Sequence, residues 1–184
     1  MRVKSKWHKS KKKSTDDIGS AMAFNCWRIT RNELEDLINE GFIIEKEQLF
    51  DIISEYLCFL IQATDRLIYQ KIPDNERQKI MVKLVKQSAQ YYHENKFDQI
   101  SKKEEHWQEF LKKFNDKTKD YSSFAFNKKP SLPFYRYFAN GILNAMTEAD
   151  EKWILSQMIE IQAPKAFKSL NKSVQNLINV DSIA

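Results

Sequence analysis

Hydrophobic residues recur at the spacing of an α-helix along most of the chain. The clearest example is the segment 45–71, which stops just before Pro73. At 100° per residue, its apolar side chains gather on one broad side of a helix. They are Leu49, Phe50, Ile53, Tyr56, Leu57, Leu60, Ile61, Leu67 and Ile68. Because the residue before a proline avoids the helical conformation, we predict a helix over residues 45–71.

The same period predicts helices in the rest of the chain. They cover residues 16–29, 74–95, 101–119, 132–146, 148–162 and 164–180, and the first either continues to residue 40 or restarts at Thr30. Four hydroxyl residues precede a carboxylate by three positions, as in a capping box: Ser14–Asp17, Thr30–Glu33, Ser101–Glu104 and Thr147–Asp150. Three glycines and four prolines offer few turns for a sheet. We predict an all-α protein, a single irregular bundle of six to eight helices over residues 15–184, with a short extended piece at 123–126.

A stripe of polar side chains interrupts the apolar surface of the predicted helix 45–71. It contains Glu55, Gln62, Asp65 and Arg66. In an ordinary amphipathic helix such a stripe faces solvent. The alternative is a polar pocket between helices, in which a carboxylate would have an altered pKa. Helical spacing does not bring Glu55 and Asp65 into contact, so we predict no catalytic role for either.

The C-terminal segment 164–180 carries an apolar ladder with helical spacing. Its members are Phe167, Leu170, Val174, Leu177 and Ile178. This face either completes the protein's own core or docks on a second copy of the chain or on another protein. The residues themselves do not distinguish the two.

Positive charge is concentrated at the N-terminus. The net charge is +5, and the first thirteen residues hold seven of the 30 basic side chains and no acid. These are Arg2, Lys4, Lys6, Lys9, Lys11, Lys12 and Lys13, with Trp7 among them. The remaining 23 basic residues face 25 acidic ones. We predict a disordered basic tail over residues 1–14, which either contacts the phosphates of a nucleic acid or only keeps the protein in solution.

A second basic and aromatic cluster lies in residues 124–138. Its basic members are Lys128, Lys129 and Arg136, and its aromatic members are Phe124, Phe126, Phe134, Tyr135, Tyr137 and Phe138. Six aromatic side chains cannot all remain in water, so we expect most of them to pack against the body. The alternative is an aromatic and basic rim that binds an anion, RNA or a partner peptide.

The sequence lacks the motifs of common catalytic and cofactor sites. It contains no Gly-x-Ser-x-Gly, no P-loop and no dinucleotide fingerprint. None of the histidines, His8, His93 and His106, follows a glutamate by three positions, as a di-iron bundle requires. Cys26 and Cys58 have no zinc-ligand spacing, and we expect both to be buried, reduced thiols. We therefore predict no catalytic residue, no metal and no cofactor.

No segment is apolar for long enough to span a bilayer, and the N-terminus lacks the hydrophobic core of a secretory signal. We therefore expect a cytoplasmic protein. The function that we favour is a non-enzymatic helical module that binds another macromolecule, above all a protein, as a subunit, a regulator or a homo-oligomer. One alternative is a nucleic-acid-associated protein that uses the tail and the loop 124–138. The other is a small-molecule binder or enzyme with a pocket at Glu55.

Overall fold

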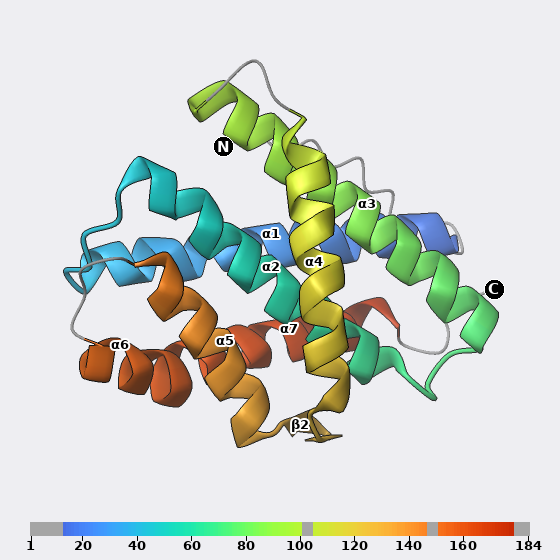
Figure 1. The fold of residues 1–184 in the computed structure, drawn as a ribbon. Helices are drawn as coiled ribbons and strands as arrows, with labels where there is room; N and C mark the ends of the chain where they lie inside the picture. Colours follow the sequence, from blue (N-terminus) through green and yellow to red (C-terminus); the bar gives the residue numbers. More distant parts are fainter. Residues whose placement is uncertain (1–12, 101–104, 147–150, 179–184) are drawn as a thin grey trace.

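A computed structural model of the protein describes residues 13–100, 105–146 and 151–178. Its elements are α1 (Thr15–Asn39), α2 (Lys46–Ile68), α3 (Asp74–Gln99), α4 (His106–Ser123), β1 (Phe126–Asn127), β2 (Lys129–Pro130), α5 (Leu132–Ala145), α6 (Glu151–Gln157), a π-helical segment η1 (Met158–Gln162) and α7 (Ala163–Leu177). The all-α prediction is confirmed, because seven α-helices and one small hairpin account for nearly all of the described chain (Figure 1). Residues 1–12 of the predicted tail lie outside the described residues, as do the pairs Ser101–Glu104 and Thr147–Asp150.

The start of α1 is the capping box that the sequence predicts. The backbone N–H of Asp17 donates to the Ser14 hydroxyl over 3.1 Å, and the backbone N–H of Ser14 donates to the Asp17 carboxylate over 3.2 Å. The hydrogen bonds from Ser14 lower the pKa of Asp17. Of the two alternatives for Thr30, the structure shows the continuous helix: Thr30 and Glu33 are buried within α1, and no new helix starts there.

A Schellman motif ends α1 and fixes the chain that follows it. The N–H of Gly41 bonds to the carbonyl of Ile38, and the N–H of Phe42 bonds to the carbonyl of Leu37, each over 3.1 Å. Gly41 has a φ of 93°, a conformation that suits glycine because it has no β-carbon. The motif directs Phe42 back toward the helices and leaves Ile43 outside.

The middle of the bundle is α2. Residues 52–64 of this helix are all buried, and α2 contacts α1, α3, α4, α5 and α7. Figure 1 shows α2 between α1 behind it and α4 in front. The ring of Phe138 on α5 lies 4.8 Å from that of Tyr56 and 4.5 Å from that of Phe59. Residues 52–64 of α2 therefore have no solvated face, which explains the long apolar run in this part of the sequence.

The loop after α4 forms a hairpin whose strands begin at Phe126, slightly later than predicted. Phe126 pairs with Pro130, and Lys128 occupies the tip with a φ of 60°. The aromatic residues of this region pack against the core, as expected: Phe134 and Phe138 are fully buried, and the other four are partly buried. The Phe134 ring lies 4.6 Å from that of Tyr121 on α4.

The helical segments α6, η1 and α7 follow one another without an intervening loop. The sequence predicts a break at Pro164, because a proline ring clashes with the carbonyl four residues earlier. The structure instead has the wider turns of a π-helix at Met158–Gln162, directly before the first turn of α7 in which Pro164 lies. π-Helical turns inside α-helices occur often at functional sites.

Candidate functional site

Glu55 of α2 is buried rather than solvated. Only 3% of the residue is exposed. Its carboxylate forms ion pairs with Lys113 Nζ at 3.1 Å and Lys117 Nζ at 2.8 Å, both on α4. Like Glu55, Gln62 is buried, so the expectation that this stripe faces solvent is wrong for both residues. The neighbouring helix α4 covers both residues. Its two lysines pair with the Glu55 carboxylate, and a buried carboxylate is stable only when it is paired in this way.

The rest of the polar stripe also joins helices. Gln62 donates to the Thr118 hydroxyl over 2.7 Å, and Arg66 donates to the carbonyl of Ser122 over 2.9 Å. Asp65 points to another neighbour and pairs with Arg77 of α3 at 2.5 Å. The structure therefore brings Glu55, Gln62 and Arg66 to one seam with α4 but does not gather the four residues around one cavity.

The apolar ladder of the last helix belongs to the protein's own core. All five of its members are buried: Phe167, Leu170, Val174, Leu177 and Ile178. The helix packs against α1 and α2. Of the two interpretations of this face, the structure shows the core, so the face is not exposed for a partner.

The predicted anion contacts divide into two groups. Lys128, Lys129 and Arg136 are all exposed, on the hairpin and on α5. The tail residues Arg2, Lys4, Lys6, Trp7, Lys9, Lys11 and Lys12 lie outside the described residues, and Lys13 is partly exposed just before α1. Anion binding by either group stays a prediction.

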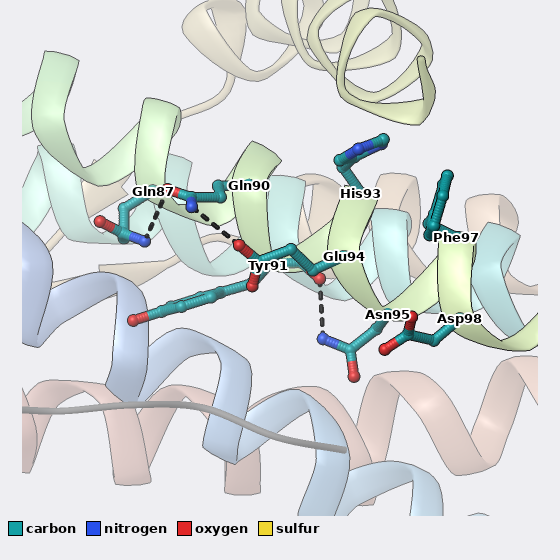
Figure 2. Close-up of a pocket in the computed structure, with 8 residues that line it drawn as sticks. All are labelled: Gln87, Gln90, Tyr91, His93, Glu94, Asn95, Phe97 and Asp98. Carbon is teal, nitrogen blue, oxygen red and sulfur yellow. Dashed lines mark hydrogen bonds between the residues drawn. The ribbon is translucent and has the colours of Figure 1, made fainter. Parts of the chain in front are cut away.

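A cavity of about 490 Å³ lies along the C-terminal half of α3 (Figure 2). Its lining residues are Gln87, Gln90, Tyr91, His93, Glu94, Asn95, Phe97 and Asp98. Gln87 donates to Gln90 over 3.2 Å, and Gln90 donates to Glu94 over 2.8 Å, so the amides form a row along the helix. In the part of the chain that the structure describes, no three His, Cys, Asp or Glu side chains are placed to hold a metal ion.

The C-terminal end of α1 gathers negative charge. Residues 33–51 contain seven acidic side chains and a single basic one, Lys46. The acidic residues are Glu33, Glu35, Asp36, Glu40, Glu45, Glu47 and Asp51. A helix C-terminus already carries partial negative charge, and the last turn of α1 contains no basic residue. The carboxylates of α1 therefore oppose the dipole of their own helix, whereas Glu45 and Glu47 stand at the start of α2, where the dipole favours negative charge. A positive charge brought close to the end of α1 would be stabilised.

Glu33 is the most deeply placed of these acids, with 2% of the residue exposed. Burial raises its pKa to about 7, and the neighbouring carboxylates of Asp36 and Glu40 add to the shift, while Lys165 of α7 opposes it. Lys165 Nζ lies 3.8 Å from Glu33 Oε2 and bonds directly to Asp36. One lysine thus serves two carboxylates, and Glu33 is held close to its point of titration at neutral pH.

The polar groups around Glu33 are incompletely paired. Gln162, which ends the π-helical segment, donates to Glu40 Oε2 over 3.3 Å, and Gln157 also donates to Glu40. Among the described residues, the Tyr56 hydroxyl, Glu33 Oε2 and Gln162 Oε1 have no hydrogen-bond partner although all are buried. Burial and the carboxylates, Glu33 first, raise the pKa of Tyr56 well above its ordinary value. Buried polar groups without partners are rare in folded proteins and mark a site of stored strain or of function.

Large apolar side chains surround the same end of α1. Ile43 is 88% exposed, Ile38 is 52% exposed and Trp153 of α6 is 49% exposed. The Trp153 ring stacks on that of Phe42, with 4.3 Å between centroids and 4° between planes. We call Ile38, Phe42, Ile43 and Trp153, together with Glu33, Asp36 and Glu40, the α1 corner. It lies at the left of Figure 1, where α1 ends beside α6.

The α1 corner combines an apolar surface with an excess of negative charge, because three carboxylates there face one lysine, Lys165. This chemistry suits a ligand that carries both hydrophobic side chains and positive charges. Comparisons with known proteins add no relative: no family model matches the chain, and no curated protein or solved structure is significantly similar to it. None of the described helices combines the length and apolar content that a bilayer crossing requires.

The α1 corner was not predicted from the sequence, although two signals for it are present. One is the excess of acids in residues 33–51 within a chain of positive net charge. The other is the triplet Phe42–Ile43–Ile44, which stands between a helix-ending glycine and the next helix. It therefore belongs to the apolar face of neither helix. Three consecutive apolar residues in a loop cannot all face inward.

Proposed function

We propose that the protein is a non-enzymatic docking module that binds a basic, amphipathic helix of another protein at the α1 corner. The observation that carries this proposal is the exposure of Ile43 and Trp153 beside carboxylates that lack sufficient counter-charge. We also propose a cytoplasmic location, which is consistent with Cys26 and Cys58 being free thiols.

Charge selects the kind of partner. Residues 33–51 hold seven acids and one base, and after the ion pairs with Arg31, Lys113 and Lys165 an excess of negative charge remains. This excess repels an acidic segment and attracts one rich in lysine or arginine. The partial negative charge at the end of α1 acts in the same direction. An amphipathic helix is the common element that presents basic and apolar side chains together, with apolar anchors at spacings of three and four residues.

The apolar anchors supply affinity. Burial of an exposed isoleucine is worth about 1.5–3 kcal/mol when it becomes complete. Because Ile43 is nearly fully exposed and Ile38 is half exposed, both can lose most of their remaining contact with water on binding. Trp153 has the flat, amphipathic ring that is enriched among the residues that dominate protein interfaces.

A photo-crosslinking experiment in the native cell tests the site. The photoreactive residue p-benzoylphenylalanine replaces Ile43 in one variant and Leu132, an isoleucine-sized residue with 54% exposure at the start of α5, in the control. We expect the Ile43 variant alone to form a specific adduct, and the crosslinked segment of the partner to be basic and amphipathic. Equal adducts at both positions, no adduct at position 43, or an acidic partner segment would each contradict the proposal.

A peptide titration tests the chemistry separately. The probes are an amphipathic helix built of leucine and lysine and its leucine and glutamate counterpart. The proposal requires the basic peptide to bind and the acidic one not to bind. Ile43→Ser should weaken the affinity for the basic peptide by about tenfold, which corresponds to about 1.4 kcal/mol, whereas Leu132→Ser should leave this affinity unchanged.

A further inference from the structure

Three lysines of α3 share one face of that helix. Lys79, Lys83 and Lys86 follow at spacings of four and three residues, which places them within about 60° around the helix axis. None of the three forms an ion pair or side-chain hydrogen bond among the described residues. By contrast, Lys113 and Lys117 neutralise carboxylates within the fold. The positive charge of the three α3 lysines is therefore available to an outside anion.

The surface around these lysines is concave. A cavity of about 600 Å³ is lined by Asn75, Gln78, Lys79, Val82, Lys83 and Lys86, with Asp16 of α1 at its edge. Residues 77–93 of α3 contain four basic side chains, those of lysine and arginine, and no acid. Asp16 is the single carboxylate in this lining, so positive charge predominates there.

The first turn of α1 lies beside this cavity. α1 begins at Thr15, and one turn later Gly19 lies so close to α3 that a β-carbon there would be 2.7 Å from Lys83 Cβ. The first turn of α1 therefore lies next to the α3 lysines, with Asp16 at the edge of the cavity. The start of α1 and the first half of α3 lie at the right of Figure 1.

We infer that this face of α3 binds the phosphate backbone of a nucleic acid. Lysine side chains neutralise phosphates as point charges and give an affinity that depends on salt rather than on sequence. A membrane surface is less suited to this face, because Val82 is the single apolar residue in the cavity lining and an interfacial helix requires a broad apolar face.

The inferred surface does not depend on the proposed docking function. The α3 lysines stand at the start of α1 and the α1 corner stands at its end, and 25 helical residues separate the two by about 37 Å. A nucleic acid and a basic partner helix can therefore occupy the protein together. Failure of either proposal leaves the other intact, because they use different residues and different probes.

The test measures the binding of a short fluorescein-labelled DNA duplex by fluorescence anisotropy, with the full-length protein and salt varied between about 50 and 200 mM. The variant carries Lys79→Gln, Lys83→Gln and Lys86→Gln. The control carries Lys112→Gln, Lys168→Gln and Lys172→Gln, three exposed lysines on α4 and α7, so both variants lose the same charge. Circular dichroism confirms that both fold.

We expect the α3 variant to reduce the slope of log K against log salt by about 2–3, since each phosphate contact contributes about 0.9. The control should change the slope by less than about 1. Equal losses in both variants would show that only net charge matters, and an unchanged slope in the α3 variant would show that the three lysines make no phosphate contact. Either result overturns the inference. So does a third result, in which phosphatidylserine vesicles bind through the same lysines and the duplex does not bind.

Discussion

Gly141 of α5 leaves open the space that the carboxylate of Glu55 on α2 occupies. A β-carbon at position 141 would overlap with Glu55 Oε2. The same carboxylate forms ion pairs with Lys113 Nζ and Lys117 Nζ of α4, at 3.1 Å and 2.8 Å. One buried side chain therefore joins three helices, and α5 contributes to this junction by lacking a side chain. The ion pairs are essential to it, because an unpaired carboxylate in this position would be strongly destabilising.

Gly141→Ala should destabilise the protein. The added methyl group forces the carboxylate away from its lysines, and overpacking of this kind costs about 1–3 kcal/mol. The higher helix propensity of alanine returns about 1 kcal/mol, so we expect a net loss of up to about 2 kcal/mol in the free energy of unfolding. Urea denaturation measures it. Asn140→Ala, at the exposed neighbouring position, is the control and should be neutral or slightly stabilising.

A double-mutant cycle separates this overlap from general packing. In a Glu55→Ala background the space beside position 141 is empty, so Gly141→Ala should become stabilising by about 1 kcal/mol through helix propensity alone. The sign of the Gly141→Ala effect thus reverses between the two backgrounds. If the change costs the same with and without Glu55, the carboxylate is not the cause of the glycine requirement.

The helices could be predicted from the sequence, but their neighbours could not. Periodicity in residues 45–71 identified α2 and placed Glu55 and Gln62 on one stripe. The expectation that this polar stripe faces solvent was wrong because α4 covers the stripe with Lys113, Lys117 and Thr118. A sequence shows the spacing of those α4 residues, but it does not show which helix they will meet.

Periodicity also does not separate a core face from a docking face. Leu170 and Val174 of α7 have the same spacing whether they meet α1 and α2 or a partner, and only the packing shows that they are buried. Two of the exposed apolar residues, Ile43 and Trp153, belong to no long periodic face. Phe42 and Ile43 are adjacent, yet 6% of one and 88% of the other is exposed, because the chain turns at the end of α1. Loop geometry decides this difference.

Gly19→Ala should be more damaging than Gly141→Ala. A β-carbon at position 19 would lie 2.8 Å from the backbone carbonyl oxygen of Ile80, as well as 2.7 Å from Lys83 Cβ. Unlike a carboxylate at the end of a side chain, a helix backbone cannot move without shifting α3 as a whole. We expect an overpacking cost at the upper end of about 1–3 kcal/mol, of which the helix propensity of alanine returns about 1 kcal/mol. The net loss in the free energy of unfolding, measured by urea denaturation, should be about 2 kcal/mol or more. Ser20→Ala, on the next and partly exposed position, is the control and should change it by less than about 0.5 kcal/mol.

The two cysteines should be unreactive in the folded protein. Cys26 and Cys58 are fully buried, and burial raises the pKa of each thiol to about 12. Reaction with a thiol reagent requires the thiolate, which is scarce at pH 8 when the pKa is that high. Ellman's reagent at pH 8 should therefore label neither cysteine in the native state and both in concentrated urea. Rapid labelling of either residue without denaturant would mean that α1 or α2 opens readily.

Glu33 should make the protein less stable as the pH rises through the neutral range. Its pKa is about 7 in the folded state, against an ordinary value of 4.5. Between these values the folded state keeps a proton that the unfolded state has released, so each rise in pH favours unfolding. The loss should begin near pH 4.5, be complete above about pH 7 and amount to at most about 3 kcal/mol. Urea denaturation at a series of pH values measures it.

Glu33→Gln should remove this dependence, because an amide stays neutral at every pH. The variant should be more stable than the natural protein at pH 8, by about 1–3 kcal/mol, and similar to it at pH 4.5. Glu35→Gln, an exposed carboxylate two residues away, is the control and should leave the pH profile unchanged. The carboxylates of Asp36 and Glu40 raise the pKa of Glu33 and Lys165 lowers it, so Lys165→Met should steepen the decline with pH. A pH profile that Glu33→Gln does not alter would place the proton elsewhere in the fold.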